Sequence, residues 1–482
     1  MSQSSRHTRR ARAFRIFLSA CLVTTVMLAL PASGQGGVAN LASPEPRASV
    51  HPGSQLDSLV ARALANNPEL QAARARAAAA RSRVGPAGLL SDPMLMVGLI
   101  NVPISPPSFT SDDMTMKMIG LQQSIPFPGK LRIRRDVAER ESAVALAALQ
   151  SAQLGVARRV KEGYYEIVFL DRSVDIVRRS ATNMSDLARV TEASYAVGRG
   201  EQADVLKARM EAGAVGASAS ALLERRRSAL ADLNRLLALP PESELEQPEI
   251  PPAVTAAAVE PNAARVHFVA STLGARAAGS SLLPLDQLQA SAVVGNPELR
   301  LRDAHVAAQA ERVRLARKEY SPDFDVTLQY GQRSGRSAGT MGGEQGKPRS
   351  DMVSAQVSFP LRFRRGAVQG KYVAEAQSEH TAVAAERSAQ ADEVRAEVAA
   401  LYNDAERART QLAIYVKAVL PQGRAALASA TGSYRTGKSG LLEVLDSQST
   451  LLTYETEYHR ALTDFAKAVS GLEQVTGTEV LR

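Results

Sequence analysis

The sequence predicts a mainly α-helical protein with a small β part, built as a duplicated helix-strand-strand-helix-helix unit. The first observation is composition: hydrophobic residues make up 45% of the 482 residues, aromatic residues 4%, and tryptophan is absent. Long stretches rich in Ala, Arg, Glu, Leu and Val are typical of long helices. The second observation is that short motifs occur twice in the same order. The third is that two pairs of alternating segments interrupt the helical pattern.

Residues 1–34 have the pattern of a secretory signal peptide. Five arginines precede an apolar run over residues 16–30, and the small-residue stretch 31–34 follows it. This run is about 15 residues long, shorter than the roughly 20 that span a bilayer. Its removal takes away five arginines and no acidic residue, so the formal net charge falls from +9 to +4. We therefore expect an exported chain that does not bind nucleic acid.

Cys21 is the only cysteine. It ends the stretch Leu18–Cys21, which resembles the site at which bacterial lipoproteins are cleaved and acylated. The apolar run continues well past Cys21, so we expect cleavage near Gly34 rather than lipid attachment at Cys21. The mature chain would then contain neither a disulfide nor a cysteine metal site.

The two copies are recognised by paired landmarks that are about 229 to 239 residues apart. They divide the chain into a first repeat (35–239), a linker rich in Pro, Ala and Ser (240–285) and a second repeat (286–482). The pairs are Asn67–Leu70 with Asn296–Leu299, Ser91–Pro93 with Ser321–Asp323, Gln123–Pro126 with Val357–Pro360, and Tyr195–Gly198 with Tyr434–Gly437.

Each repeat contains two predicted strands: about 94–102 and 114–125 in the first, and 323–330 and 352–360 in the second. One apolar and one polar face over eight or nine residues is typical of a transmembrane barrel hairpin. A half-buried soluble hairpin has the same periodicity, so periodicity alone leaves both interpretations open.

Aligning Pro126 with Pro360 places three residues from each repeat on one apolar face, the presumed lipid side. They are Ile119, Leu121, Ile125, Val353, Ala355 and Phe359. Tyr330 and Phe359 are candidates for the membrane interfaces. Four strands cannot close a barrel, for which about eight is the usual minimum, and an open edge in lipid leaves backbone groups unpaired. Several chains must therefore share one barrel, and three chains would supply twelve strands.

Each strand pair is followed by an unusually long helix, about 131–196 and 367–435. Second helices returning from near Glu201 and Gly440 would complete helical hairpins over 131–239 and 367–476. Pro421 predicts a kink or a two-piece helix in the second repeat. Gly198 and Gly437 are expected to adopt the left-handed conformation that ends a helix at each tip.

Residues 432–439 read GSYRTGKS and match the phosphate-binding loop G-x-x-x-x-G-K-[ST]. That loop must follow a strand, whereas the helical run Ala425–Ala430 precedes it here. The equivalent stretch of the first repeat, 193–200, keeps only Tyr-x-x-Gly. The six histidines show no metal-ligand spacing, and no Gly-x-Ser-x-Gly element stands out on a strand-turn-helix frame. We therefore predict that the protein is not an enzyme and needs no cofactor.

Five of the 11 methionines, Met94, Met96, Met114, Met116 and Met118, lie in or beside the first strand pair. The alternation places Met114, Met116 and Met118 on the polar, lumen-facing side with Gln122 and Ser124. Thioether sulfur is a soft ligand that selects Cu(I) and similar ions, so these methionines are candidate metal contacts. The alternative is that methionine is simply a tolerated apolar residue in a strand.

The combined pattern resembles the TolC family of bacterial outer-membrane factors over nearly all of the mature chain. Its first specific mark is the stretch Pro126–Lys130 after the second strand; in the second repeat, Arg362–Arg365 stands in place of its Pro-Gly-Lys. Its second mark is Tyr-x-x-Gly, which is followed by Asp204–Leu206 in the first repeat and by Glu443–Leu445 in the second. Within the family, the strand-loop sequences resemble the CusC- and CzcC-like channels of heavy-metal and multidrug pumps. The resemblance implies a homotrimer with a twelve-stranded barrel in the outer membrane, continued by a periplasmic α-helical barrel.

By the same resemblance, the channel conducts passively. A periplasmic adaptor (membrane fusion protein) and an inner-membrane transporter of the RND type would be its partners, together with outer-membrane lipid. At the periplasmic entrance, Asp204, Glu443 and Asp446 would line or brace the opening near Tyr195 and Tyr434, with Lys438 contacting a carboxylate or the adaptor. The alternative is that the carboxylates only stabilise the first turns of the returning helices.

Two questions stay open at the level of the sequence. A periplasmic coiled-coil scaffold or adaptor without a membrane barrel is the second hypothesis for function. Drugs or a type I secreted protein are alternatives to metal ions as cargo.

Overall fold

A computed structural model describes residues 55–104, 107, 114–259, 282–334 and 349–481. The chain divides into two units, 1–48 and 49–482, and only the second contains described residues. The predicted signal peptide, Cys21, and parts of the loop 103–113 and of the linker lie outside the described residues.

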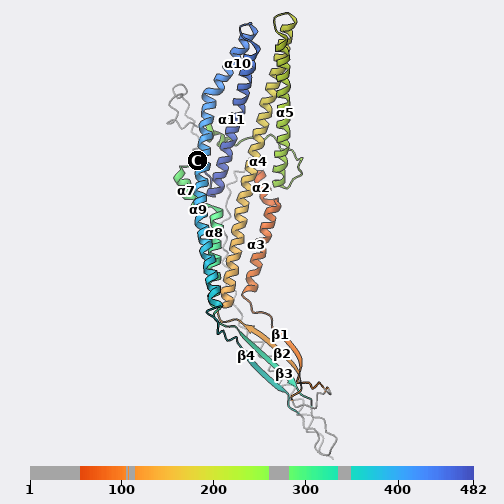
Figure 1. Ribbon diagram of the computed structural model, residues 1–482, viewed down its shortest axis with the longest axis vertical. Coiled ribbons are helices and arrows are strands. Elements are labelled where there is room, and N and C mark those ends of the chain that lie inside the picture. The colour runs from red at the N-terminus through yellow and green to blue at the C-terminus, as the bar shows by residue number, and fades with distance from the viewer. Residues whose placement is uncertain (1–54, 105–106, 108–113, 260–281, 335–348, 482) are drawn as a thin grey trace, which may run out of the picture. The chain divides into compact units, whose positions relative to one another are not determined.

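The described chain is mainly helical with four strands, as predicted (Figure 1). None of the described helices is both long and apolar enough to cross a membrane. The first repeat contains α2 (Gln55–Asn66), α3 (Pro68–Ala87), β1 (Met94–Ile100), β2 (Met116–Ile125), α4 (Lys130–Ala196) and α5 (Gln202–Leu237). Helix α6 (Pro252–Val259) lies in the predicted linker. The second repeat contains α7 (Leu285–Gly295), α8 (Pro297–Lys318), β3 (Phe324–Gln332), β4 (Met352–Ser358), α9 (Gln369–Ile414), the π-helix η1 (Tyr415–Val419), α10 (Leu420–Arg435) and α11 (Leu441–Thr476).

The duplication extends to individual hydrogen bonds of one asparagine in each repeat. The Asn67 side chain accepts from the amides of Glu69 (2.9 Å) and Leu70 (3.3 Å), and donates to the carbonyl oxygen of Leu236 (2.9 Å). Its counterpart makes the same set of bonds: Asn296 accepts from Glu298 and Leu299 and donates to Val475, each at 2.9 Å. Each asparagine therefore begins one helix and holds it to the end of the returning helix of its repeat.

The four strands form one antiparallel sheet in the order β1-β2-β3-β4. The central β2–β3 pairing joins the two repeats, and β1 and β4 are the edges. The register confirms the predicted apolar face through the rows Val97–Ile119–Tyr330–Val353, Leu95–Leu121–Leu328–Ala355 and Ile125–Phe324. The opposite face has the polar rows Gln122–Thr327–Gln356 and Ser124–Asp325–Ser358.

The strand ends differ from the predicted ones by up to two residues, for local reasons. Strand β1 ends at Ile100 because Asn101 has a left-handed backbone (φ 54°) and its carbonyl accepts a hydrogen bond from Thr115 Oγ1 at 2.6 Å. Strand β4 ends at Ser358, shortly before Pro360, which lacks an amide hydrogen. Strand β3 is longer than predicted and ends at Gln332.

The long helix of the first repeat, α4, has 67 residues without interruption. The helix of the second repeat is interrupted, as Pro421 predicted, but the irregularity precedes the proline. It is the π-helix η1, five residues long, and α10 begins directly after it with Pro421 in its first turn. A proline cannot donate to the preceding turn, and a π-bulge is a common way to accommodate that loss.

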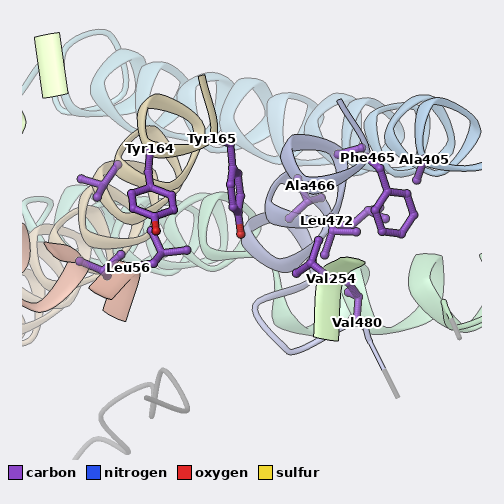
Figure 2. Close-up of a cluster of buried hydrophobic side chains, with 14 of the residues drawn as sticks. Leu56, Tyr164, Tyr165, Val254, Ala405, Phe465, Ala466, Leu472 and Val480 are labelled. Carbon is purple, nitrogen blue, oxygen red and sulfur yellow. The ribbon is translucent and has the colours of Figure 1, made fainter. Parts of the chain in front are cut away.

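The largest apolar core lies where α4, α5, α9 and α11 meet the short helices α2, α6 and α7. Figure 2 shows Tyr164, Tyr165 and Phe465 in this cluster, with Leu56 and Val254 from the short helices. The Tyr164 hydroxyl donates to the carbonyl of Glu249 (3.0 Å) and accepts from its amide (2.9 Å). A second, smaller cluster between the helical hairpins contains Met184, Ala208 and Leu441.

Candidate functional site

The two helical hairpins end in matching tight turns, one in each repeat (Figure 1). Gly198 and Gly437 are both left-handed, with φ of 76° and 73°, as predicted. Their amides donate to the carbonyls of Tyr195 (2.9 Å) and Tyr434 (3.0 Å), and the next amides donate to Ser194 and Ser433, each at 2.9 Å. These are the bonds of a helix C-cap that requires a left-handed residue.

The second turn also shows which structure the GSYRTGKS stretch adopts. Its first four residues, Gly432 to Arg435, are the last turn of α10, so the motif lies on a helix end. A phosphate-binding loop needs a strand before it and a helix after it. The motif is therefore a helical tip.

The two tip tyrosines differ in their surroundings. Tyr434 is half-buried, and its hydroxyl is 3.1 Å from the hydroxyl of Thr191 on α4. Tyr195 is 46% exposed. Tyr434 therefore connects the second hairpin to the first. Thr191 did not appear among the predicted site residues, because an isolated threonine within a long helix carries no pattern that distinguishes it.

The predicted entrance carboxylates are near the tips but do not meet Lys438. Asp204 is half-buried in the first turn of α5, while Glu443, Asp446 and Lys438 are exposed. Among the described residues of one subunit, no ion pair joins Lys438 to these carboxylates. Asp204 and Glu443 lie in the first turns of their helices, where a negative charge is stabilised by the helix dipole.

Other polar contacts connect the two hairpins or the helices within one of them. Gln448 Nε2 on α11 donates to Ser180 Oγ on α4 at 3.1 Å, in a buried position. Arg209 on α5 forms an ion pair with Glu192 on α4 at 2.6 Å. The helical hairpins are thus joined to each other by hydroxyl and amide hydrogen bonds, and an ion pair joins the two helices of the first hairpin.

The polar face of the sheet has a cluster of methionines at the end of the strands away from the helices. We call Met116, Met118 and Met352 the methionine cluster; register places all three on the polar face, together with Met94 and Met96. The cluster surrounds Gly331, the Cα partner of both Met118 and Met352. A Cβ atom at Gly331 would lie 2.5 Å from Met116 Sδ, so this glycine makes room for the thioether.

A buried lysine fixes the junction between the sheet and the helices. Lys130, at the start of α4, is fully buried, and its Nζ contacts Glu319 Oε2 (2.9 Å) and Asp323 Oδ1 (2.8 Å) in the second repeat. Asp323 Oδ1 also accepts from the Phe127 amide at 2.8 Å. Burial alone would raise the pKa of Asp323, but these bonds hold that pKa below its ordinary value. Lys130 lies in the Pro126–Lys130 motif, so the motif serves to join the repeats.

Within the described ranges, no group of three or more His, Cys, Asp or Glu side chains is placed to hold a metal ion. Any metal contact on the sheet would therefore have to use thioether sulfur and the neighbouring amide and hydroxyl oxygens.

The chain matches the family described as Outer membrane efflux protein over residues 59–239 and 288–478, which is most of its length and follows the two repeats. This chain belongs to the outer membrane efflux protein family. A comparison with curated proteins found no match.

Solved structures of outer-membrane proteins share the fold. The outer-membrane channel OprN is 19% identical, with a TM-score of 0.68 over 88% of this chain and 89% of its own. VceC from Vibrio cholerae is also 19% identical, with a TM-score of 0.68 over 88% and 97%. CusC is 15% identical, with a TM-score of 0.69 over 88% and 92%. The scores for OprN and CusC are nearly equal, so a CusC-like subtype remains a prediction.

Family and fold together identify an outer-membrane efflux channel that extends into the periplasm, and a transport protein rather than an enzyme. The alternative of a periplasmic scaffold without a barrel does not agree with this membership.

Proposed function

We propose that three copies of this chain form one channel, in which twelve strands close a barrel in the outer membrane and the helical hairpins continue it through the periplasm. The observation that carries the proposal is the four-stranded sheet with two open edges and one exposed apolar face. An unpaired edge in lipid leaves backbone groups without partners, which costs several kcal/mol for each group.

Pairing of β4 with β1 of the next subunit removes both edges at once. This seam would have the same arrangement as the β2–β3 pairing within the chain. In both pairings, the last strand of one repeat lies beside the first strand of the next repeat. Three subunits would then give six equivalent hairpins around the barrel.

We propose that conduction is passive, as the family resemblance implies; the GSYRTGKS stretch ends a helix and does not follow a strand as a phosphate-binding loop does. We propose that an inner-membrane transporter of the RND type supplies the energy, and that a periplasmic adaptor connects it to the hairpin tips. At the entrance, Asp204, Glu443 and Asp446 would form threefold rings of carboxylates that favour cations. Tyr195, Tyr434 and Lys438 would surround these rings, with Gly198 and Gly437 shaping the tips.

Gel electrophoresis of outer-membrane fractions with and without heating tests the channel. The expected result is a band of trimer size that converts to monomer on boiling. A monomer before boiling, found in the soluble periplasmic fraction, would contradict the proposal.

For the cargo, we propose soft metal ions such as Cu(I) or Ag(I). The support is the methionine cluster and the position of Met94 and Met96 on the same polar face. Met114 lies before the start of β2 and is 53% exposed, so it would act at the mouth of the lumen. Threefold repetition would place several thioethers around one lumen. Drugs and a type I secreted protein are the alternative cargoes.

Tolerance measurements in a strain lacking the gene distinguish these cargoes. Restoring the wild-type gene should restore tolerance to silver and copper, and a variant with Met116, Met118 and Met352 changed to leucine should not. Met184→Leu is the matched control, because Met184 is buried between helices away from the sheet. Loss of dye and detergent tolerance with unchanged metal tolerance on deletion would reject metal as the cargo.

A further inference from the structure

The turn that follows β4 has an unusual combination of residues. We call residues 359–366 the basic-aromatic turn; it reads FPLRFRRG and leads into α9. No acidic residue occurs between Asp351 and Glu375, while Arg362, Arg364 and Arg365 lie in the turn. The rest of the mature chain has nearly balanced charges, so this is a local excess of positive charge.

The apolar side chains of the turn are exposed, although the Phe359 ring also packs edge-on against Phe324, with ring centroids 6.1 Å apart. Phe359 is 52% exposed, Leu361 67% and Phe363 89%. Arg364 and Arg365 are exposed too, and neither forms an ion pair within the described chain. Full exposure of a phenylalanine to water is unfavourable, by roughly 1.5–3 kcal/mol relative to burial, so a partner that covers it is expected.

The backbone holds the turn in this shape. The amides of Phe363 and Arg365 donate to the carbonyls of Leu361 (3.1 Å) and Arg362 (3.3 Å), and the Gly370 amide donates to Arg365 (3.1 Å). The Arg362 guanidinium donates to the carbonyl oxygen of Glu319. Phe363 is therefore presented outward by a hydrogen-bonded turn.

We infer that the basic-aromatic turn binds the phospholipid leaflet that faces the periplasm. Leu361 and Phe363 lie in the boundary between headgroups and acyl chains, and Arg364 and Arg365 bind the phosphates of the headgroups. The inference rests on the proposed function, which places the apolar face of the sheet in lipid. The turn directly continues that face, because it follows Val353, Ala355 and Val357 at the end of β4 nearest the helices.

The chemistry of the turn matches this position in a membrane. Aromatic residues gather at both edges of a membrane barrel, and here tryptophan is absent, so phenylalanine takes that place. Arginine binds phosphate with two parallel hydrogen bonds, and positive side chains are attracted to the headgroup layer.

The corresponding turn of the first repeat is used differently. Phe127 is half-buried, stacks on Phe324 with ring centroids 6.3 Å apart, and is covered by Lys318 Nζ at 4.8 Å. Lys130, three residues later, is buried in the junction. The turn of the first repeat therefore uses its aromatic and basic residues to join the repeats, whereas the turn of the second repeat leaves Phe363, Arg364 and Arg365 exposed.

The absence of tryptophan allows a direct test in the full-length protein, reconstituted into phosphatidylglycerol–phosphatidylcholine vesicles. Single tryptophans replace Phe363, Val357 or Tyr372, so each variant has one fluorophore. Val357 is 61% exposed on the apolar face, and Tyr372 is 58% exposed on α9, beyond the turn. Quenching is compared between lipids brominated near the headgroup and lipids brominated near the chain ends.

Phe363→Trp should be quenched about twofold or more relative to Tyr372→Trp, and most strongly by bromine near the headgroup, as expected at a membrane interface. If Phe363→Trp is not quenched while Val357→Trp is, the inference is overturned and the proposed channel stands. Phe363 would then lie in water or be buried against a neighbouring subunit. If Val357→Trp is also unquenched, the proposed membrane barrel itself fails.

The phosphate contact is tested by adding Arg364→Gln and Arg365→Gln to the Phe363→Trp protein. Quenching by headgroup bromine should fall to about half, because the turn loses its attraction to the headgroups. The same two changes in Val357→Trp are the control and should leave quenching unchanged. Unchanged quenching of Phe363→Trp would overturn the role of the arginines.

Discussion

Asn67 and Asn296 each stabilise two helices, because the oxygen and the nitrogen of the side-chain amide both form hydrogen bonds. Each caps a helix through Oδ1 and binds a carbonyl on the returning helix through Nδ2, in a buried position. Asn67→Ala should lower the free energy of unfolding by about 1–3 kcal/mol, because the cap is lost and a buried carbonyl loses its donor. Thermal unfolding followed by circular dichroism measures the change.

Asn67→Asp separates the two contributions, because aspartate keeps the cap acceptor and loses the donor. It should be destabilising, since its carboxylate would lie against the Leu236 carbonyl. Stability equal to that of the wild type would show that the Nδ2 bond contributes little.

The entrance carboxylates lead to a second prediction at the level of residues. Neutralising Glu443 and Asp446 together, by Glu443→Gln and Asp446→Asn, should reduce the cation selectivity of the channel, because the proposed rings lose six negative charges in a trimer. Reversal potentials across a planar bilayer in a salt gradient measure this. Asp392→Asn on α9 is the control, as an exposed residue far from the tips. Unchanged selectivity would leave the carboxylates with the helix-stabilising role alone.

At the level of elements, Glu166 forms two ion pairs between α4 and α11. It binds Lys467 and Arg460, the latter at 3.1 Å, and Arg460 lies over the Phe169 ring at 3.8 Å. Burial alone would raise the pKa of Glu166, but the bonds and charges of the two cations outweigh it and hold the pKa below its ordinary value of 4.5. A lowered pKa stabilises the fold above the unfolded-state pKa, and this stabilisation is lost as pH falls through the folded-state pKa.

Glu166→Gln should therefore lower the melting temperature at pH 7, by a loss of about 1–3 kcal/mol, and the difference from wild type should shrink below pH 4.5. Circular dichroism melts at several pH values measure it. The exposed pair of Asp392 with Arg395 supplies the control, since Asp392→Asn should change little. A difference that is the same at all pH values would show that charge is not responsible.

The elements also show what the sequence could predict. The strand faces and the hairpin turns follow from periodicity and from paired motifs, which are local properties. Pro421 predicted the position of the helix interruption only approximately, because the π-helix η1 lies in the turn that precedes this proline. The contacts of Lys130 and of Thr191 join residues about 190 to 240 positions apart, and no local pattern specifies such pairs.

At the level of the whole molecule, the duplicated chain makes the β2–β3 contact a covalently linked version of the contact proposed between subunits. The central pairing extends over nine residue pairs, and each outer pairing over seven. A single chain therefore already contains one complete instance of the geometry that the trimer would use three more times.

The open edges of the sheet predict the effect of a defective subunit in a cell that also makes the wild-type protein. In the proposed trimer the ring closes only if every β4–β1 seam forms, so one defective edge would inactivate its two healthy neighbours. Ala355→Pro, which prevents regular pairing along β4, should therefore be dominant when expressed beside the wild-type gene. Tolerance of the doubly expressing strain, with membrane levels of both proteins checked by immunoblot, measures dominance. A fully recessive phenotype at equal levels would mean that each chain works alone.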